Sequence, residues 1–306
     1  MKKLNFKKIF YSLASSFLIF VGVAALTGCN SLPVGNHVNA VELLDGNSDV
    51  YIAIPKSVDT EFVRMIIRKS IPGITESQMN QICDRTAKIY CGISGSSGEF
   101  GLQASVEGEI PTSLIPIMLS EKKGWSSRSV TTEGAFFSHE VYSANGIDLA
   151  FPSNGIVCVG RGIEEMINKY DYLAYDSILP VPGINLEFVD APDNKYLPGE
   201  VYNYLGGDDS SIRFYANNPL YLITSLLGLK LDLNVVNGRG AFSVSDRNPN
   251  KYLLEIFLDF ESEKFLKAGK ALLRLFGVDV SQDGSNTLQI KGIEIEKKDL
   301  YGLLNF

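Results

Sequence analysis

Apolar and polar residues alternate with two different periods along most of the chain. Residues 49–55 and 87–94 are apolar at every second position, as in strands, whereas 59–71 carries apolar side chains at helical spacing. Thr75 and Gln78 then have the spacing of a capping box at the start of a second helix. The pattern predicts short strands interleaved with amphipathic helices, which is an α+β fold with mostly antiparallel sheets and packed helices.

Caps and turns bound these first elements. Asp59 is the predicted N-cap of the first helix. Strands at 87–94 and 99–110 are separated by Gly95–Gly98, which predicts a hairpin. The remaining elements predicted in this part are a helix at 112–123, strands at 139–144, 147–151 and 155–160, and a helix at 163–170.

The same order of elements recurs in the second part of the chain. A strand at 211–219 and an apolar helix at 220–229 precede a strand, turn, strand and helix over 241–277. The spacing agrees with a repeat, because Ala87 and Ala241 are 154 residues apart, Gly124 and Gly277 are 153 apart, and Asp49 and Ser211 are 162 apart. We therefore predict two related halves, each built like βαββαβ.

Domain boundaries follow from this repeat. Residues 177–210 are rich in proline and glycine, which predicts a connection between the halves. The predicted units are a signal peptide at 1–28, a tether at 29–47, a first α+β half at 48–176, the connection at 177–210 and a second α+β half at 211–306.

The chain opens with lysines followed by a long uncharged run. Lys2, Lys3, Lys7 and Lys8 precede Ile9–Leu26, which holds no charged residue. A basic start and an apolar run are the parts of an export signal. The run is also nearly long enough to span a bilayer, so hydropathy alone leaves a retained single-span anchor open.

The apolar run closes on Leu26-Thr27-Gly28-Cys29, which resembles the lipobox of bacterial lipoproteins. The resemblance implies cleavage before Cys29 by signal peptidase II, a thioether-linked diacylglycerol on Cys29, and an acyl chain such as palmitate on the new amino group. Two or three acyl chains make a durable anchor. By the same resemblance, Asn30 favours the outer membrane, on its periplasmic or surface face, over the inner membrane of the bacterial cell envelope.

Charge restricts the class of partner. Of the 28 Lys and Arg residues four lie in 1–28, so the processed chain keeps 24 against 35 Asp and Glu, a net charge of −11. A body this acidic argues against nucleic acid, which is bound through basic side chains. The predicted partners are the lipid bilayer, through acylated Cys29, and an envelope protein or an apolar ligand.

Patterns that would carry catalysis or bind a metal are incomplete. With His37 and His139 as the two histidines and no C-x-x-C, a Cys/His metal site is not expected. The serines of 92–98 do not fit a nucleophile elbow, and Glu165 stands where a dinucleotide loop needs glycine. Residues 279–290 begin like a calcium loop but lack its final Glu, so a hairpin turn explains them better. No catalytic residue, cofactor or metal is predicted.

Three cysteines remain once Cys29 is acylated. Cys91 alternates with apolar neighbours, and Cys158 lies between two valines, so both are expected in a core; Cys83 is expected on a helix. A Cys91–Cys158 or Cys83–Cys91 bridge is the alternative in an oxidising envelope.

The last long helix carries a basic stripe. Its members are Lys264, Lys267, Lys270 and Arg274. A solvated outer face is the expected role of such a stripe, and contact with anionic lipid headgroups is the alternative.

These features favour a membrane-anchored lipoprotein that acts as a non-enzymatic binding or interaction module. The alternative is a carrier that holds an apolar or lipid ligand between the two halves, with the 220–229 helix lining the site. A hydrolase using carboxylates such as Glu107, Glu109 or Glu255 is the third hypothesis, which no spacing supports.

Overall fold

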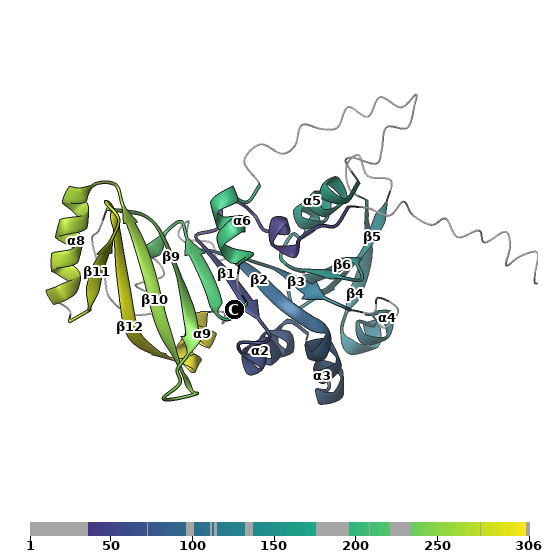
Figure 1. Cartoon of the computed structure of the whole chain (residues 1–306). Coiled ribbons are helices and arrows are strands. Elements are labelled where there is room, and N and C mark those ends of the chain that lie inside the picture. The colour runs from purple at the N-terminus through teal and green to yellow at the C-terminus, as the bar shows by residue number, and fades with distance from the viewer. Residues whose placement is uncertain are drawn as a thin grey trace, which may run out of the picture.

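A large antiparallel sheet is the framework of the molecule (Figure 1). The computed structural model describes residues 36–303 apart from 72, 96–100, 111, 113–114, 132–136, 176–195, 208, 221–233 and 276. In this part of the chain the 12 strands run in the order β11-β12-β10-β9-β8-β1-β2-β3-β7-β6-β5-β4, and every neighbouring pair is antiparallel. The predicted α+β class with antiparallel strands is confirmed.

Burial differs along the sheet: β10 alternates buried with less buried positions, whereas every residue of β1 and β7 is buried. Their bounds are β1 Val50–Pro55, β2 Thr86–Ser94, β3 Gly101–Gly108, β4 Ser126–Thr131, β5 Ser138–Ala144, β6 Ile147–Ser153, β7 Ile156–Gly160, β8 Ile212–Ala216, β9 Val235–Val244, β10 Lys251–Phe260, β11 Val280–Asp283 and β12 Thr287–Glu296. The described helices are η1 Ala40–Leu43, α2 Thr60–Ser70, α3 Glu76–Arg85, α4 Ile115–Met118, η3 Glu121–Lys123, α5 Glu164–Tyr175, α6 Gly199–Leu205, α8 Glu263–Leu275 and α9 Lys297–Leu303.

Two hydrophobic cores lie on opposite faces of the sheet. The larger core joins the sheet to α2, α3, α4, α8 and α9, and it runs through strands of both parts of the chain. The smaller core joins the other face of the central strands to η1, α5 and α6. Figure 1 shows α2 and α3 below the central strands and α5 and α6 above them. Helices therefore cover both faces of the sheet in its middle.

Capping fixes the starts of α2 and α3 as the sequence predicts. The Asp59 carboxylate accepts a hydrogen bond from the Phe62 amide at 3.0 Å, which caps α2. Thr75 and Gln78 form the reciprocal pair of a capping box at α3. Both local predictions are confirmed. The sequence reveals these caps because each depends on residues only three positions apart.

The predicted helix at 112–123 is wrong. The structure has α4 and η3 there, each a single short turn. Pro116 lies inside the predicted segment, and in a continuous helix its ring would clash with the carbonyl of residue 112. The proline is tolerated only because α4 begins one residue before it.

The predicted tether at 29–47 is too long. From residue 36 onward the chain is part of the folded body, and η1 buries Val41 and Leu43 in the smaller core. The predicted connection at 177–210 likewise contains α6, which buries Val201 and Leu205. Isolated apolar residues among Asn, Gly and Pro gave no period in either segment, so their burial was missed.

Residues 279–290 form the hairpin of β11 and β12 rather than a calcium loop. Val280 to Asp283 pair with Thr287 to Ile290, and Gly284 adopts a left-handed conformation, with a φ of 78°, in the turn. The predicted helix at 220–229 falls almost wholly outside the described residues.

Candidate functional site

An apolar cavity of about 390 Å³ lies between the central strands and helices α2, α3 and α4. Cavities of roughly 300–1,000 Å³ are the usual size for one small ligand. Every described residue that lines it falls between Ile66 and Arg161, in the first part of the chain. Its apolar residues are Ile66, Ile67, Ile71, Ile82, Ile89, Cys91, Leu102, Ala104, Val106, Ile110, Ile115, Met118, Leu119, Ile147, Leu149, Phe151, Val157 and Val159.

Alternate residues of four neighbouring strands form the sheet side of the cavity. Cys91, Ala104, Val159 and Leu149 face one another in register across β2, β3, β7 and β6. Side chains on one face of a strand repeat every second residue, so this row shares its face with the apolar rows beside it. Cys91 and Ala104 are the small members of the row. We attribute the space to these two positions, because larger side chains there would fill it.

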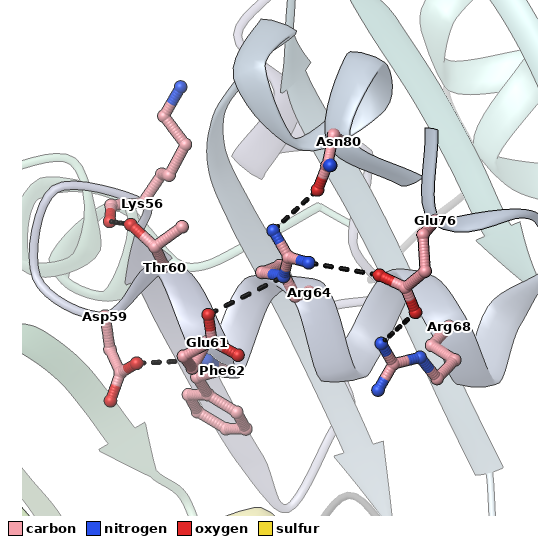
Figure 2. A network of polar contacts seen from close by, with 9 residues as sticks. All are labelled: Lys56, Asp59, Thr60, Glu61, Phe62, Arg64, Arg68, Glu76 and Asn80. Atoms are coloured by element: carbon pink, nitrogen blue, oxygen red, sulfur yellow. Dashed lines mark hydrogen bonds and ion pairs between the residues drawn. The ribbon is translucent and has the colours of Figure 1, made fainter. Parts of the chain in front are cut away.

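A polar network holds α2 against α3 on the opposite side of the cavity (Figure 2). Arg64 donates to Asn80 at 2.6 Å and to Glu76 at 3.2 Å, and Arg68 donates to Glu76 at 2.7 Å. Glu61 lies 3.6 Å from Arg64 on the same helix. The network faces solvent, so each ion pair adds little to stability. It joins the solvent-facing sides of the two helices that cover the cavity.

Asp59 anchors the start of α2 to distant parts of the chain. Besides capping α2, its carboxylate accepts hydrogen bonds from the hydroxyls of Tyr252 on β10 and Tyr301 on α9, the latter at 2.9 Å. Lys297 lies 2.9 Å from the same carboxylate oxygen. The aromatic rings of Phe62 and Tyr301 stack beside this cluster, with their centroids 4.6 Å apart. One buried carboxylate therefore ties α2 to both β10 and α9.

The charge of Asp59 is stabilised where it lies. The side chain is only 3% exposed. Burial alone raises the pKa of Asp59, but the hydrogen bonds from Tyr252, Lys297 and the other donors outweigh burial and hold the pKa below its usual value. Asp59 is thus a carboxylate at neutral pH. Burial, together with its hydrogen bond to this carboxylate, raises the pKa of Tyr252, which remains a neutral donor.

The three described cysteines are buried free thiols. Burial raises the pKa of Cys91 to about 12, so this cavity residue is neutral at physiological pH. Cys91 belongs to the larger core and Cys158 to the smaller one, on the opposite face of the sheet. A Cys91–Cys158 bridge, one of the alternatives from the sequence, is incompatible with this arrangement.

Of the carboxylates weighed for catalysis, Glu107 and Glu255 do not come together. Nε2 of His139 lies 2.8 Å from the Asp171 carboxylate, in a partly buried pair. Glu107 lies on β3 and Glu255 on β10, and four strands separate them in the sheet. At roughly 4.8 Å per strand, the two carboxylates are on the order of 24 Å apart. Glu255 accepts a hydrogen bond from Gln289 instead.

In the basic stripe of α8, Lys264, Lys267 and Arg274 are exposed and Lys270 is half-buried. Leu266, Gly269 and Leu273 are buried, whereas Lys267 pairs with Glu263 at 2.8 Å in a surface ion pair.

Cys29, the predicted lipidation residue, lies outside the described residues. Within the described part of the chain no helix is long and apolar enough to cross a membrane. No cluster of metal-ligating side chains occurs among these same residues.

Comparison with known families identifies the class of protein. A family model described as "Outer membrane-associated lipoprotein TP0453" matches residues 35–301. The chain belongs to the TP0453 family. It is therefore a lipid-anchored lipoprotein of the bacterial outer membrane, as the lipobox and Asn30 predict.

Solved structures of TP0453 have the same fold as this chain. Crystal form I superposes with a TM-score of 0.62 at 19% identity, covering 88% of this chain and 97% of that one. Crystal form III gives a TM-score of 0.59 at 18% identity, covering 88% and 98%. Crystal form IV gives 0.58 at 19% identity, covering 88% and 97%. A search of curated proteins finds no match.

The cavity was anticipated in kind but not in place. The sequence suggested an apolar site between the halves, whereas the described cavity lies wholly within residues 66–161. Cys91 was expected to face a core, and it does. The empty space of the cavity depends on two small residues, Cys91 and Ala104, being neighbours. Only the strand register brings them together. No local pattern in the sequence signals that pairing.

Proposed function

We propose that this outer membrane-associated lipoprotein is a non-enzymatic carrier that holds one apolar chain, such as a lipid tail, in the first-half cavity. The observation that supports it most is the cavity itself, about 390 Å³ and lined mainly by aliphatic side chains. A chain buried there leaves water for an apolar environment, which favours binding by about 0.8 kcal/mol for each methylene group. The size suits a single chain rather than several.

The way the cavity is enclosed also supports a binding role. Its sheet side belongs to the 12-stranded sheet, and its helical side includes α2, which Asp59 anchors to β10 and α9. A preformed site of this kind loses little free energy to ordering when a ligand enters. The carboxylates Glu107 and Glu255 are far apart and have other neighbours, which favours binding over hydrolysis.

Blocking the cavity tests this proposal. The contacts described above are made by residues from Asn36 onward, so a chain that starts at residue 30 keeps them. We would titrate this chain with a fluorescent single-chain fatty acid and compare Ala104→Phe, which fills the cavity, with Ala271→Phe on the exposed side of α8.

The expected result is one site per chain in the unsubstituted protein and in Ala271→Phe, with loss of that site in Ala104→Phe. Circular dichroism and thermal unfolding would establish that both variants are folded. Equal binding by both variants would show that the probe binds elsewhere and would overturn the proposal.

The anchor is proposed to be the acylated Cys29, left at the N-terminus when residues 1–28 are removed as a signal peptide. The lipobox supports this residue assignment, and the family match supports the lipoprotein class. In cells given labelled palmitate, the unsubstituted chain should take up label and Cys29→Ser should not. Equal labelling of both would remove Cys29 from the account.

A duplication is the proposed origin of the body. The order β1-β2-β3-β7-β6 on one side of the sheet corresponds to β8-β9-β10-β12-β11 on the other. The strands β1 and β8 pair antiparallel at the centre, as a two-fold arrangement of related halves would require. In both halves a helix follows the third strand of this series: α4 after β3 and α8 after β10. The order of elements and their spacing support the proposal, although residue identity between the halves is low.

A further inference from the structure

The charged side chains among the described residues that line the cavity are all cationic. They are Lys69, Arg85 and Arg161, and none of the described lining residues carries a carboxylate. This contrasts with the whole chain, whose net charge is −7. Lys69 has an interaction with another group. Arg85 and Arg161 form no ion pair with any described residue, whereas Arg64 and Arg239 pair with carboxylates.

The two arginines lie at opposite ends of the cavity. Arg85 precedes Thr86, which pairs with Gly108 at one end of β3, and Arg161 follows Gly160, which pairs with Gln103 near the other end. Five residues of strand separate these two levels, which corresponds to about 17 Å. The apolar lining occupies the length between them, so each arginine stands where the apolar surface ends.

Two carboxamide side chains also line the cavity, one on α3 with Arg85 and one in the turn between β5 and β6. Gln81 lines the cavity with Arg85, and Asn145 lines it with Arg161. The Arg161 guanidinium lies against the turn between β5 and β6, about 4.0 Å from where a Cβ on Gly146 would stand. Both arginines are exposed, so their charged ends contact water while apolar side chains surround the space beside them. A guanidinium at either end can donate hydrogen bonds to an anion.

We propose that the ligand is a single-chain anionic amphiphile whose carboxylate or phosphate is bound by Arg85 or Arg161. This inference rests on the proposed carrier function. The planar guanidinium pairs with either anion through two parallel hydrogen bonds. The tail lies along β3, over Cys91 and Ala104. Because the described lining residues include cations and no carboxylates, the charges around the cavity attract an anionic head group. A long-chain fatty acid and a single-chain phosphate ester share this chemistry.

The test compares ligands that differ only in the charge of the head. The chain from residue 30 would be titrated with hexadecanoic acid, with its methyl ester, and with hexadecyl phosphate. The variants are the Arg85→Gln/Arg161→Gln pair and Arg274→Gln, an exposed arginine of α8 that does not line the cavity. Inorganic phosphate alone is included as a competitor.

We expect the unsubstituted chain and Arg274→Gln to bind the acid about tenfold more tightly than the ester, the effect of one charged hydrogen bond at an exposed site. The double variant should bind the acid and the ester with equal affinity.

Tighter binding of hexadecyl phosphate than of the acid would identify the head group as a phosphate. Tighter binding of the acid would identify it as a carboxylate. Equal binding of acid and ester by the unsubstituted chain would overturn the anionic class and leave the carrier function standing. Loss of binding by every ligand would instead refute the carrier function. Displacement by inorganic phosphate as effective as by hexadecyl phosphate would overturn the amphiphile, since only the anion would then be recognised.

Discussion

Replacing Asp59 tests whether one buried carboxylate fixes the helix that covers the cavity. Asp59→Ala removes the α2 cap and leaves the hydroxyls of Tyr252 and Tyr301 and the ammonium of Lys297 without their shared acceptor. Loss of the cap costs about 1 kcal/mol. Removing one partner of a buried ion pair costs about 3–5 kcal/mol. Because these terms overlap, we expect a total loss of about 4 kcal/mol in the free energy of unfolding.

Urea denaturation would measure this loss, with Thr75→Ala as the control. Thr75 caps α3 at the surface and has no such cluster, so its replacement should cost about 1 kcal/mol. The pKa of Asp59 is lowered in the folded chain, so its contribution is complete above the unfolded pKa of about 4 and is lost as pH falls below it. The difference between the unsubstituted chain and Asp59→Ala should therefore shrink in acid. A loss no larger than that of Thr75→Ala at pH 7 would refute the anchoring role of Asp59.

Three further predictions concern the cavity and its covering helices. Ala104→Leu should raise stability by up to about 2 kcal/mol, because it buries three more carbons in open space at about 0.8 kcal/mol each and repacking strain offsets part of this gain. A fall in the thermal midpoint would mean that the space is already filled. Cys91 should react with iodoacetamide at pH 8 far more slowly in the folded chain than in urea, because burial raises its pKa to about 12 and the thiolate is the reactive form. Equal rates of modification in the two states, measured by mass spectrometry, would contradict this. Glu76→Gln should cost less than about 1 kcal/mol in urea denaturation, since its pairs with Arg64 and Arg68 are exposed; a loss above 2 kcal/mol would contradict the surface role.

Local features of the fold could be predicted from the sequence because their causes are local. Asp59 and Thr75 cap helices through groups three residues away, and the period of two at 87–94 is visible in the letters alone. The reach of Asp59 could not be predicted in this way. Its partner Tyr252 lies 193 positions along the chain, and Tyr301 lies 242 positions along it. No spacing rule extends across such separations.

The candidate site could be predicted only in part for a related reason. Cys91 was expected in a core from its alternation with isoleucines, and this is confirmed. That Cys91 faces Ala104 depends on the register of β2 and β3, whose connecting residues show a turn but not its pairing. Arg85 and Arg161 carried no signal at all in the sequence. They acquire a common role only when the sheet places them at the two ends of one cavity.

The account predicts most directly that a single acyl chain lies between the sheet and helices α2, α3 and α4. A long-chain fatty acid with a photoreactive diazirine in its tail would be bound to the chain from residue 30, irradiated, and the labelled peptides identified by mass spectrometry. Label within residues 66–161, on segments that line the cavity, and its loss in Ala104→Phe would agree with the account. Label confined to α8 or to other residues after 200, unaffected by Ala104→Phe, would contradict it.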